Sequence, residues 1–335
     1  MRMDQERKAR MTRRRLLLCI GAAALAPMGR GAQGQPLYPD RPVTIINPFA
    51  PGGQTDPLGR LVAQQLQRAL KQPFVVDNRT GAGGTIGAQF VARAAPDGHT
   101  LLLGTTSTYV IAPFVYRPQT YDPETAFTPV AVLSEGAMIL TTHPRTGFRS
   151  VTDVVRAARD RPGEVTIASA GNGSLPHVIG ELFASTAGLK LTHVPYRGGA
   201  PAMSDLIGGQ VDLFFEVVSN VAQHAEAQRV VPLLTTGATR SPLLPDVPTA
   251  AEAGYADLAL TSWTGLAAPA GTPAPIVAMV NREANAALAS EEGQALLARL
   301  GITAVGGTPA AMAARIAREV PVYKRIITKA GISVQ

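Results

Sequence analysis

Glycine, hydroxyl and amide groups are concentrated in four short segments of this sequence, each between a predicted strand and a predicted helix. The first is NPFAPGGQTD at residues 47–56, which follows the apolar run 43–46 and precedes a helical pattern that begins at Leu58. Its glycines allow a sharp turn in which backbone N–H groups approach a ligand. The following helix begins with unpaired N–H groups and a partial positive charge, so the segment suits an anion. A turn that only connects two elements is the alternative.

We expect Thr55 or Asp56 to cap this helix with a side-chain oxygen. Residues 104–107, 168–177 and 196–201 have the same construction, and Ser174 is expected to cap the helix after the second of them. In an open α/β sheet such loops gather at the carboxyl ends of the strands, where ligands bind. The candidate contacts are Phe49, Ala50, Gly53, Gln54, Asp56, Thr105, Ser107, Ala170, Asn172, Gly173, Ser174, His177 and Arg197.

Two further residues are candidates because of their places in the pattern. Glu216 ends the apolar strand 211–215 and faces either a ligand or solvent. Trp263 is the only tryptophan and lies on the extended segment 258–263. It either packs in the core or forms a wall of the ligand site. We include both residues in the expected site.

No catalytic, metal or cofactor site is expected. Ser174 and His177 resemble a fragment of a hydrolase, but no orienting carboxylate accompanies them. Residues 81–87 resemble a dinucleotide loop, yet Ile86 stands where the third glycine is needed. The five histidines show no metal-ligand spacing, so bracing of a loop is the simpler role for His177; they are His99, His143, His177, His193 and His224.

The N-terminal residues read as an export signal. Residues 1–34 carry a net charge of +6 out of +7 for all 335 residues, so the remainder lacks the basic surface that nucleic-acid binding requires. A basic region ends at Arg15, the apolar stretch 16–26 follows, and small residues at Ala32 and Gly34 suggest cleavage before Gln35. Export by either the Sec or the twin-arginine route fits. The only cysteine, Cys19, lies inside this signal.

Apolar strands alternate with helical patterns in two blocks of the chain. The first block contains strands at 43–46, 74–76 and 101–103, and the second has strands at 165–168, 191–194 and 211–215. Such alternation predicts an α/β fold with mostly parallel sheets. Residues 130–140 and 258–268 read as two extended crossings between the blocks. Helices at 275–289 and 309–330 close the chain.

Six stretches in this order resemble the Bug family of periplasmic solute receptors, the extracytoplasmic subunits of tripartite tricarboxylate transporters. The resemblance covers residues 37–335, although Thr80 and Gly59 depart from its usual pattern. The stretches are residues 47–56, 78–84, 95–102, 171–177, 195–201 and 244–254.

The resemblance implies a two-lobed type II periplasmic binding protein fold, with a ligand cleft between the lobes. We expect a signal peptide at 1–34, lobe one at 35–136 and 264–335, and lobe two at 137–263. It also implies that backbone amides and hydroxyls of the loops at 47–56 and 172–174 hold a ligand carboxylate as the lobes close.

The expected function is capture of a small organic carboxylate and its delivery to membrane transporter subunits, by a monomer without enzymatic activity, cofactor or nucleic-acid partner. An exported ligand sensor for a signalling system and an exported α/β enzyme acting on an organic acid are the alternatives. The sequence leaves the identity of the solute open.

Overall fold

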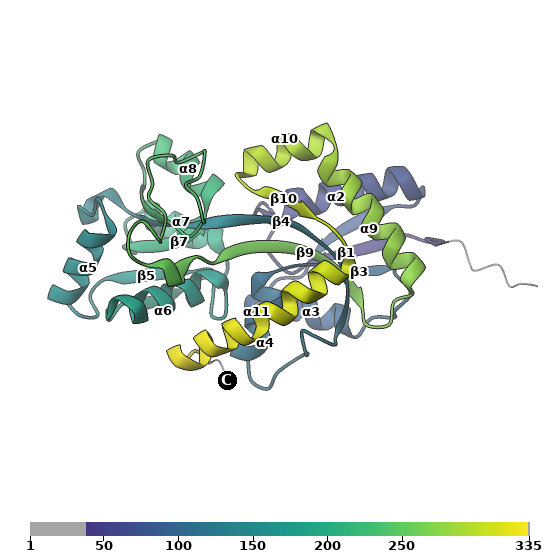
Figure 1. The fold of residues 1–335 in the computed structure, drawn as a ribbon, viewed down its shortest axis with the longest axis horizontal. Helices are drawn as coiled ribbons and strands as arrows, with labels where there is room; N and C mark the ends of the chain where they lie inside the picture. Colours follow the sequence, from purple (N-terminus) through teal and green to yellow (C-terminus); the bar gives the residue numbers. More distant parts are fainter. Residues whose placement is uncertain (1–37, 334–335) are drawn as a thin grey trace, which may run out of the picture. The chain divides into compact units, whose positions relative to one another are not determined.

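The computed structural model describes residues 38–333 of the chain, and residues from Arg41 onward form one compact unit. The predicted export signal at residues 1–34 lies outside the described residues. Within the described part, one mixed sheet of ten strands has helices on both sides (Figure 1).

The strands follow the order β2-β1-β3-β9-β4-β7-β5-β6, and both β8 and β10 pair with β4. Their bounds are β1 Val43–Asn47, β2 Phe74–Asn78, β3 Thr100–Thr105, β4 Phe127–Thr142, β5 Thr166–Ser169, β6 Thr192–Pro195, β7 Leu213–Val217, β8 Val231–Thr235, β9 Thr261–Pro269 and β10 Thr303–Gly306. We call β1, β2, β3, β9 and β10 the first strand group, and β5, β6, β7 and β8 the second strand group.

The two strand groups repeat one topology. In the first, β1 is parallel to both β2 and β3; in the second, β5 is parallel to both β6 and β7. The chain therefore moves outward from β1 to β2 and then returns across β1 to β3, and the second group follows the same path. This reversal creates a switch point beside β1 and another beside β5, and ligands of open α/β sheets bind at such points.

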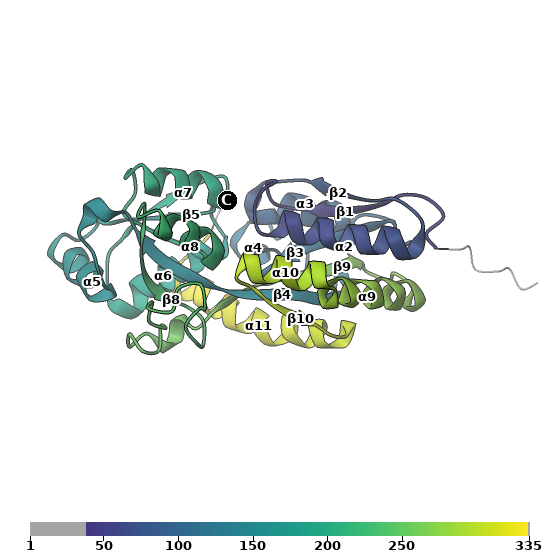
Figure 2. The ribbon, with the colours of Figure 1, turned by 90° about the horizontal axis from the view of Figure 1, so that it is seen from above.

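Strand β4 belongs to both groups. Residues 127–137 of β4 pair with β9. The last part of the strand pairs with β7 from Met138 to Thr142 and with β8 from Ile139 to Thr142. Both views of the ribbon show β4 and β9 running side by side through the middle of the described unit (Figures 1 and 2). The prediction of one long strand through a crossing at 130–140 is confirmed.

Helices cover both faces of the sheet. Phe214 and Phe215 follow each other in β7 and therefore point to opposite faces; Phe215 packs in one core cluster with Phe183, and Phe214 in another with Met203 and Val221. The α-helices are α2 Thr55–Leu70, α3 Thr85–Ala92, α4 Ala112–Val115, α5 Val151–Asp160, α6 Leu175–Ala187, α7 Gly199–Ile207, α8 Val218–Glu226, α9 Ala274–Ala289, α10 Glu291–Leu300 and α11 Pro309–Ala330. Short turns of other helix types are η1 Ala82–Gly84, η2 Ser107–Ile111, η3 Pro144–Thr146 and η4 Ala256–Leu258.

Helix caps agree only in part with the sequence pattern. Ser150 caps α5 with a reciprocal bond to Asp153, as its position at the start of a helix suggests. The expected cap of α2 by Thr55 or Asp56 is wrong, because its N-cap residue is Gln54, which makes no side-chain cap bond. Thr55 instead donates to Asn47 Oδ1 at 3.0 Å, which ties the helix to the end of β1.

Candidate functional site

The loop after β1 presents free backbone donors at the first switch point. Asn78 Nδ2 donates to the carbonyl of Phe49 at 2.9 Å, and Gly52 has a φ of +83°, so the turn is held from outside while its own N–H groups stay open. Within the described residues, no hydrogen bond uses the backbone N–H of Ala50, Gly53 or Gln54. Ala50 and Gly53 are exposed, and Phe49 and Gln54 are half-buried. This part of the predicted site can therefore donate to an anion.

Asp56 limits where that anion can lie. Its side chain is 11% exposed, Oδ2 accepts from Arg60 Nε at 3.1 Å, and Oδ1 has no hydrogen-bond partner within the described part of the chain. A carboxylate in the first helical turn already fills the region that the positive end of α2 favours. A bound anion would therefore be held by the loop upstream of Asp56 and not by the helix end itself.

Two more buried polar atoms at this edge lack partners. Asn47 is fully buried at the end of β1, and Thr105 is 8% exposed at the end of β3. Neither Asn47 Nδ2 nor Thr105 Oγ1 makes a hydrogen bond within residues 38–333. Buried polar groups are normally satisfied, so these two fit a place that a ligand or an ordered water completes. The sequence pattern identified Thr105 but did not single out Asn47.

In the loop after β5, several backbone N–H groups already donate hydrogen bonds to other atoms of the protein. Gly171 N–H donates to Ser169 Oγ at 3.1 Å and Gly173 N–H to His177 Nδ1 at 3.2 Å. Ser174, the residue before α6, donates its Oγ to the Gly171 carbonyl at 2.6 Å and does not cap the helix with its side chain. The expected cap by Ser174 is therefore wrong. Asn172 stays half-buried, and no bond uses its N–H within the described part.

The first strand group supplies the missing cap of α6. Ser107 Oγ, at the start of η2, accepts from Leu175 N–H at 3.0 Å. Tyr116 adds a second bond, from its hydroxyl to the Asn172 carbonyl at 2.8 Å. The predicted site residues Ser107 and Asn172 thus each bond to a residue on the opposite side of the site, Ser107 to Leu175 and Asn172 to Tyr116. Tyr116 is a site neighbour that the sequence pattern missed, since nothing marks a lone tyrosine after a helix.

His177 braces this loop in its neutral form. Its ring stacks on His193 with centroids 3.9 Å apart, and Nε2 lies 3.9 Å from Glu181 Oε1. Burial and the neighbouring His193 lower the pKa of His177 to about 3, and burial also lowers the pKa of His193. Neutral His177 can accept the Gly173 N–H, whereas a protonated ring would lose that acceptor.

The loop after β6, at residues 196–201, brings Glu216 and α7 together. Glu216 is 7% exposed, so the alternative that it faces solvent is wrong. Its Oε1 accepts from Val217 N–H at 2.8 Å. Arg197, on the loop before α7, is exposed and forms no ion pair within the described residues. Ala170 is half-buried beside this loop, with Gly171 close to the Tyr196 carbonyl.

Trp263 lies in the core and not on a wall of the site. Its side chain is fully buried and stacks on Tyr109 at 5.3 Å between ring centroids. Nε1 donates to Glu319 Oε2 at 2.7 Å, and Arg315 lies over the ring. The inclusion of Trp263 among the ligand contacts is therefore corrected, because all its faces are taken by protein.

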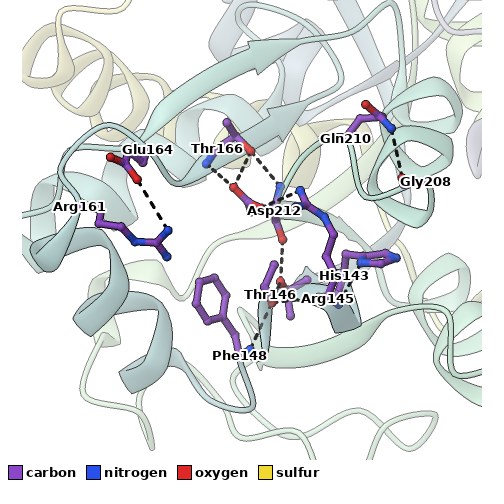
Figure 3. Close-up of polar contacts among 11 residues, drawn as sticks. His143, Arg145, Thr146, Phe148, Arg161, Glu164, Thr166, Gly208, Gln210 and Asp212 are labelled. Atoms are coloured by element: carbon purple, nitrogen blue, oxygen red, sulfur yellow. Dashed lines mark hydrogen bonds and ion pairs between the residues drawn. The ribbon is translucent and has the colours of Figure 1, made fainter.

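A dense polar cluster at the opposite edge of the second strand group is structural (Figure 3). Asp212 precedes β7, and its Oδ2 accepts from both the N–H and the hydroxyl of Thr166 at 2.9 Å. Oδ1 accepts from Arg145 at 3.1 Å, and Thr142 donates to the Asp212 carbonyl at 2.7 Å. The cluster ties together the beginnings of β5 and β7 and the end of β4, far from the carboxyl ends where the loops gather.

The described part of the chain also contains two cavities. One cavity of about 570 Å³ lies between α8 and the loop 243–247, and another of about 290 Å³ lies beside the end of α11. Among residues 38–333, no three His, Cys, Asp or Glu side chains form a metal-binding group. No helix in that range is both long and apolar enough for a membrane span.

Comparison with known proteins assigns the family. Residues 58–332 match the tripartite tricarboxylate transporter family receptor, TctC, and the chain belongs to this family. BugT of Bordetella pertussis is 36% identical over 287 residues, which cover 84% of this chain and 86% of BugT. The predicted resemblance to Bug receptors is confirmed.

Solved structures share the fold. A protein from R. palustris determined with adipate is 38% identical, has a TM-score of 0.83, and covers 88% of this chain and 99% of its own. MatC from Rhodopseudomonas palustris, determined with bound malate, is 33% identical with a TM-score of 0.82, covering 87% and 100%. The chain therefore has the α/β fold of periplasmic binding proteins, as expected.

Proposed function

We propose that this protein is a periplasmic receptor that captures a small organic carboxylate and delivers it to the membrane subunits of a tripartite transporter. The ligand would lie between the loops after β1 and β3 on one side and the loops after β5 and β6 on the other. The observation that carries this proposal is the set of free N–H donors at Ala50, Gly53 and Gln54 beside the unpartnered Asn47 and Thr105. Adipate and malate in the two solved relatives support a carboxylate.

The donors suffice for useful affinity. A hydrogen bond to a charged group contributes about 1.5–3 kcal/mol, and micromolar binding needs about 8 kcal/mol after association costs. Several backbone N–H groups and hydroxyls can reach this range together. Arg197 is exposed, so its charge would add less than the fixed donors of the loops.

Receptor function is favoured over hydrolysis because the serine of the serine–histidine pair that is hydrogen-bonded within residues 38–333 is buried. Ser169 Oγ lies 2.6 Å from His193 Nε2, which resembles a nucleophile with its base. Ser169 is fully buried, however, and its Oγ also accepts the Gly171 N–H. A substrate carbonyl has no approach to an oxygen in that position.

The same proposal includes export, two lobes and closure. The segment 1–34 would direct export and be removed, and lobes at 35–136 with 264–335 and at 137–263 would close around the ligand by bending near β4 and β9. A monomer serving a transporter is the simplest assembly. A sensor that reports the same ligand to a signalling protein is the alternative. Deletion of the membrane transporter subunits would separate the two, because it should abolish uptake of the ligand but leave a signalling response intact.

Binding of organic acids tests the proposal. Thermal unfolding with a panel of mono-, di- and tricarboxylates should identify a ligand, because a hundredfold excess over Kd stabilises the folded state by about 2.7 kcal/mol. Calorimetry of Gly53→Val should then show loss of most affinity, and Arg197→Gln a smaller loss. Gly53 suits this test because only the Ala50 carbonyl, at 3.6 Å, lies near an added Cβ, whereas Gly173 has a φ of +72° and Val115 at 3.1 Å.

Failure of every acid in the panel to stabilise the protein would contradict the proposed ligand class. Loss of binding in Arg197→Gln with retention in Gly53→Val would replace the backbone donors by an arginine as the anchor. Mass spectrometry of periplasmic protein tests export separately, with an expected N-terminus near Gln35.

A further inference from the structure

Glu216 is a buried carboxylate that forms no ion pair with any residue of the described part of the chain. It lies one residue before the end of β7, on the face that carries Phe214 and the α7 helix. Its Oε1 accepts from Val217 N–H, and within the described residues its Oε2 makes no hydrogen bond and neither oxygen forms an ion pair. Charged groups in a protein interior are normally paired, so the open Oε2 acceptor indicates that a hydrogen-bond donor can bind here.

A glycine at position 199 admits this carboxylate to the first turn of α7, and Gly198 allows the turn that precedes it. A methyl group at position 199 would lie 2.5 Å from Glu216 Oε2, so any other residue there would push the side chain away. Gly198 has a φ of +139°, a conformation that only glycine adopts readily. No bond uses the N–H of Gly199 or Ala200 within residues 38–333. Glu216 therefore places a negative charge at the N-terminal end of α7. Without this charge, the partial positive charge of the helix end would attract an anion.

The direction of β7 puts this carboxylate at the sheet edge where the proposed ligand loops gather. Ala168 in β5 pairs with Phe214 in the parallel strand β7, so Glu216 lies towards the same strand ends that lead into the loops after β5 and β6. The loops after β5 and β6 touch here, because a Cβ on Gly171 would lie 3.0 Å from the Tyr196 carbonyl. Glu216 thus lies beside the predicted ligand loop that leads into α7.

Resting on the proposed function, we propose that Glu216 determines the second functional group of the ligand. The ionised carboxylate accepts a hydrogen bond from a hydroxyl or ammonium group on the ligand and repels a second carboxylate. The first ligand carboxylate is held by the loop after β1. The selected solute class is then a hydroxy or amino acid in preference to a diacid of the same length.

The surroundings make this selection depend on pH. Burial raises the pKa of Glu216 to about 7, and only the Val217 N–H opposes the shift. Once protonated, the Glu216 carboxyl can donate a hydrogen bond to a second carboxylate of the ligand and no longer repels it. The titratable groups on the elements packed against β7 are Glu135 on β4, His177 and Glu181 on α6, Asp205 on α7, and His224 and Glu226 on α8, with Arg197 on the loop before α7. Among them Asp205 is bound to Tyr196, and none is hydrogen-bonded or ion-paired to Glu216.

Matched ligands test the proposal. Calorimetry at about pH 8.5 would compare α,ω-diacids of three to six carbons with the ω-hydroxy and ω-amino acids of the same length. Wild-type protein should bind a hydroxy or amino acid more tightly than the matched diacid. Glu216→Gln removes the charge with little change in size and should shift the ratio of the two Kd values towards the diacid by at least about tenfold.

The control and the pH dependence isolate Glu216. Glu226→Gln makes the same substitution on an exposed residue of α8 and should leave the ratio unchanged. At about pH 6 the wild-type ratio should move towards the diacid, while the ratio of Glu216→Gln stays constant. Thermal unfolding checks that each variant is folded. Glu216→Asp keeps the charge and should keep the preference, which checks that the charge is responsible.

The outcomes separate this inference from the proposed function. If acids bind but Glu216→Gln and wild type share one ratio at both pH values, Glu216 is not the selector and the receptor proposal stands. If the wild type prefers the diacid at about pH 8.5, the inference is also wrong. If no acid of this series binds any folded variant while another acid of the wider panel does, the inference fails and the receptor proposal stands.

Discussion

Ser107 Oγ accepts the Leu175 N–H at 3.0 Å and so caps a helix that begins 68 residues later in the chain. Helices are usually capped by the residue that precedes them, but Ser174 Oγ is bound to the Gly171 carbonyl. The start of α6 in the second strand group therefore depends on a hydroxyl from the first. A ligand carboxylate that reached this helix end would have to replace or join the Ser107 hydroxyl.

Removal of this hydroxyl should affect both stability and binding. We expect Ser107→Ala to lower the free energy of unfolding by about 0.5–2 kcal/mol, the usual cost of losing a cap, and to change the affinity for the cognate acid. Ser150→Ala removes the cap of α5 and should cost a similar amount without changing affinity. Urea unfolding and calorimetry measure the two effects, and equal affinities in both variants would show that the Ser107 cap is only structural.

Acid should destabilise the protein through His177. Its folded-state pKa is lowered to about 3, against about 6.5 in the unfolded chain, so between these values the unfolded state binds the extra proton. The stabilisation is complete above about pH 6.5 and is lost as the pH falls towards 3, by up to about 1.4 kcal/mol per pH unit. Urea midpoints of His177→Asn should therefore change less between pH 7 and pH 5 than those of wild type.

Glu181 provides the control for this pH dependence. Burial raises the pKa of its carboxyl, so the folded state gains stability from it as the pH falls. Glu181→Gln should make the loss on acidification steeper, in contrast to His177→Asn. The explanation would be wrong if both substitutions changed the slope in the same direction.

Trp263→Phe should weaken the fold and spare the ligand. The substitution removes the bond from Nε1 to Glu319 and leaves that carboxylate with Arg315 at 2.8 Å. We expect a loss of about 1–3 kcal/mol in the free energy of unfolding, with ligand affinity unchanged. A large loss of affinity at unchanged stability would return Trp263 to the wall of the site.

Asp212→Asn should destabilise the second strand group. The amide can replace only one of the carboxylate oxygens as an acceptor, so the bonds from Thr166 and Arg145 cannot all persist. We expect a loss of about 1.5–3 kcal/mol in the free energy of unfolding, measured with urea. Arg145→Gln, whose side chain is half exposed, should cost less than about 1 kcal/mol, and a greater cost than that of Asp212→Asn would contradict this account.

The strand–helix order and the glycine-rich loops were predictable because they depend on local residue types. The crossing strand at 130–140 could be predicted for the same reason. Helix α10 and strand β10 were missed, because charged residues at 291–300 hide a short helix that packs on α9 and α8. The pattern places Trp263 on an extended crossing, but its burial depends on Tyr109 and Glu319, which are far away in sequence.

The candidate site was less predictable than the fold. The loops were identified by composition, whereas the use of each N–H group depends on contacts with other elements. The donors of residues 171–175 look as free in the sequence as those of residues 50–54, yet His177, Ser169 and Ser107 bind them. The surroundings of the carboxylate at position 216 likewise depend on a distant residue, because Gly199 at the start of α7 lies against it.

Because β9 lies between β3 and β4, the first strand group can be completed only after the second strand group has been synthesised. Strand β3 and the first part of β4 find β9 only after the chain has been made as far as residues 261–269. The second strand group, which is synthesised in between, needs nothing beyond β4 to pair its strands. Until β9 arrives, the unpaired edges of β3 and β4 can bind other extended chains, so the first part to emerge from a ribosome or a membrane pore stays vulnerable to aggregation the longest.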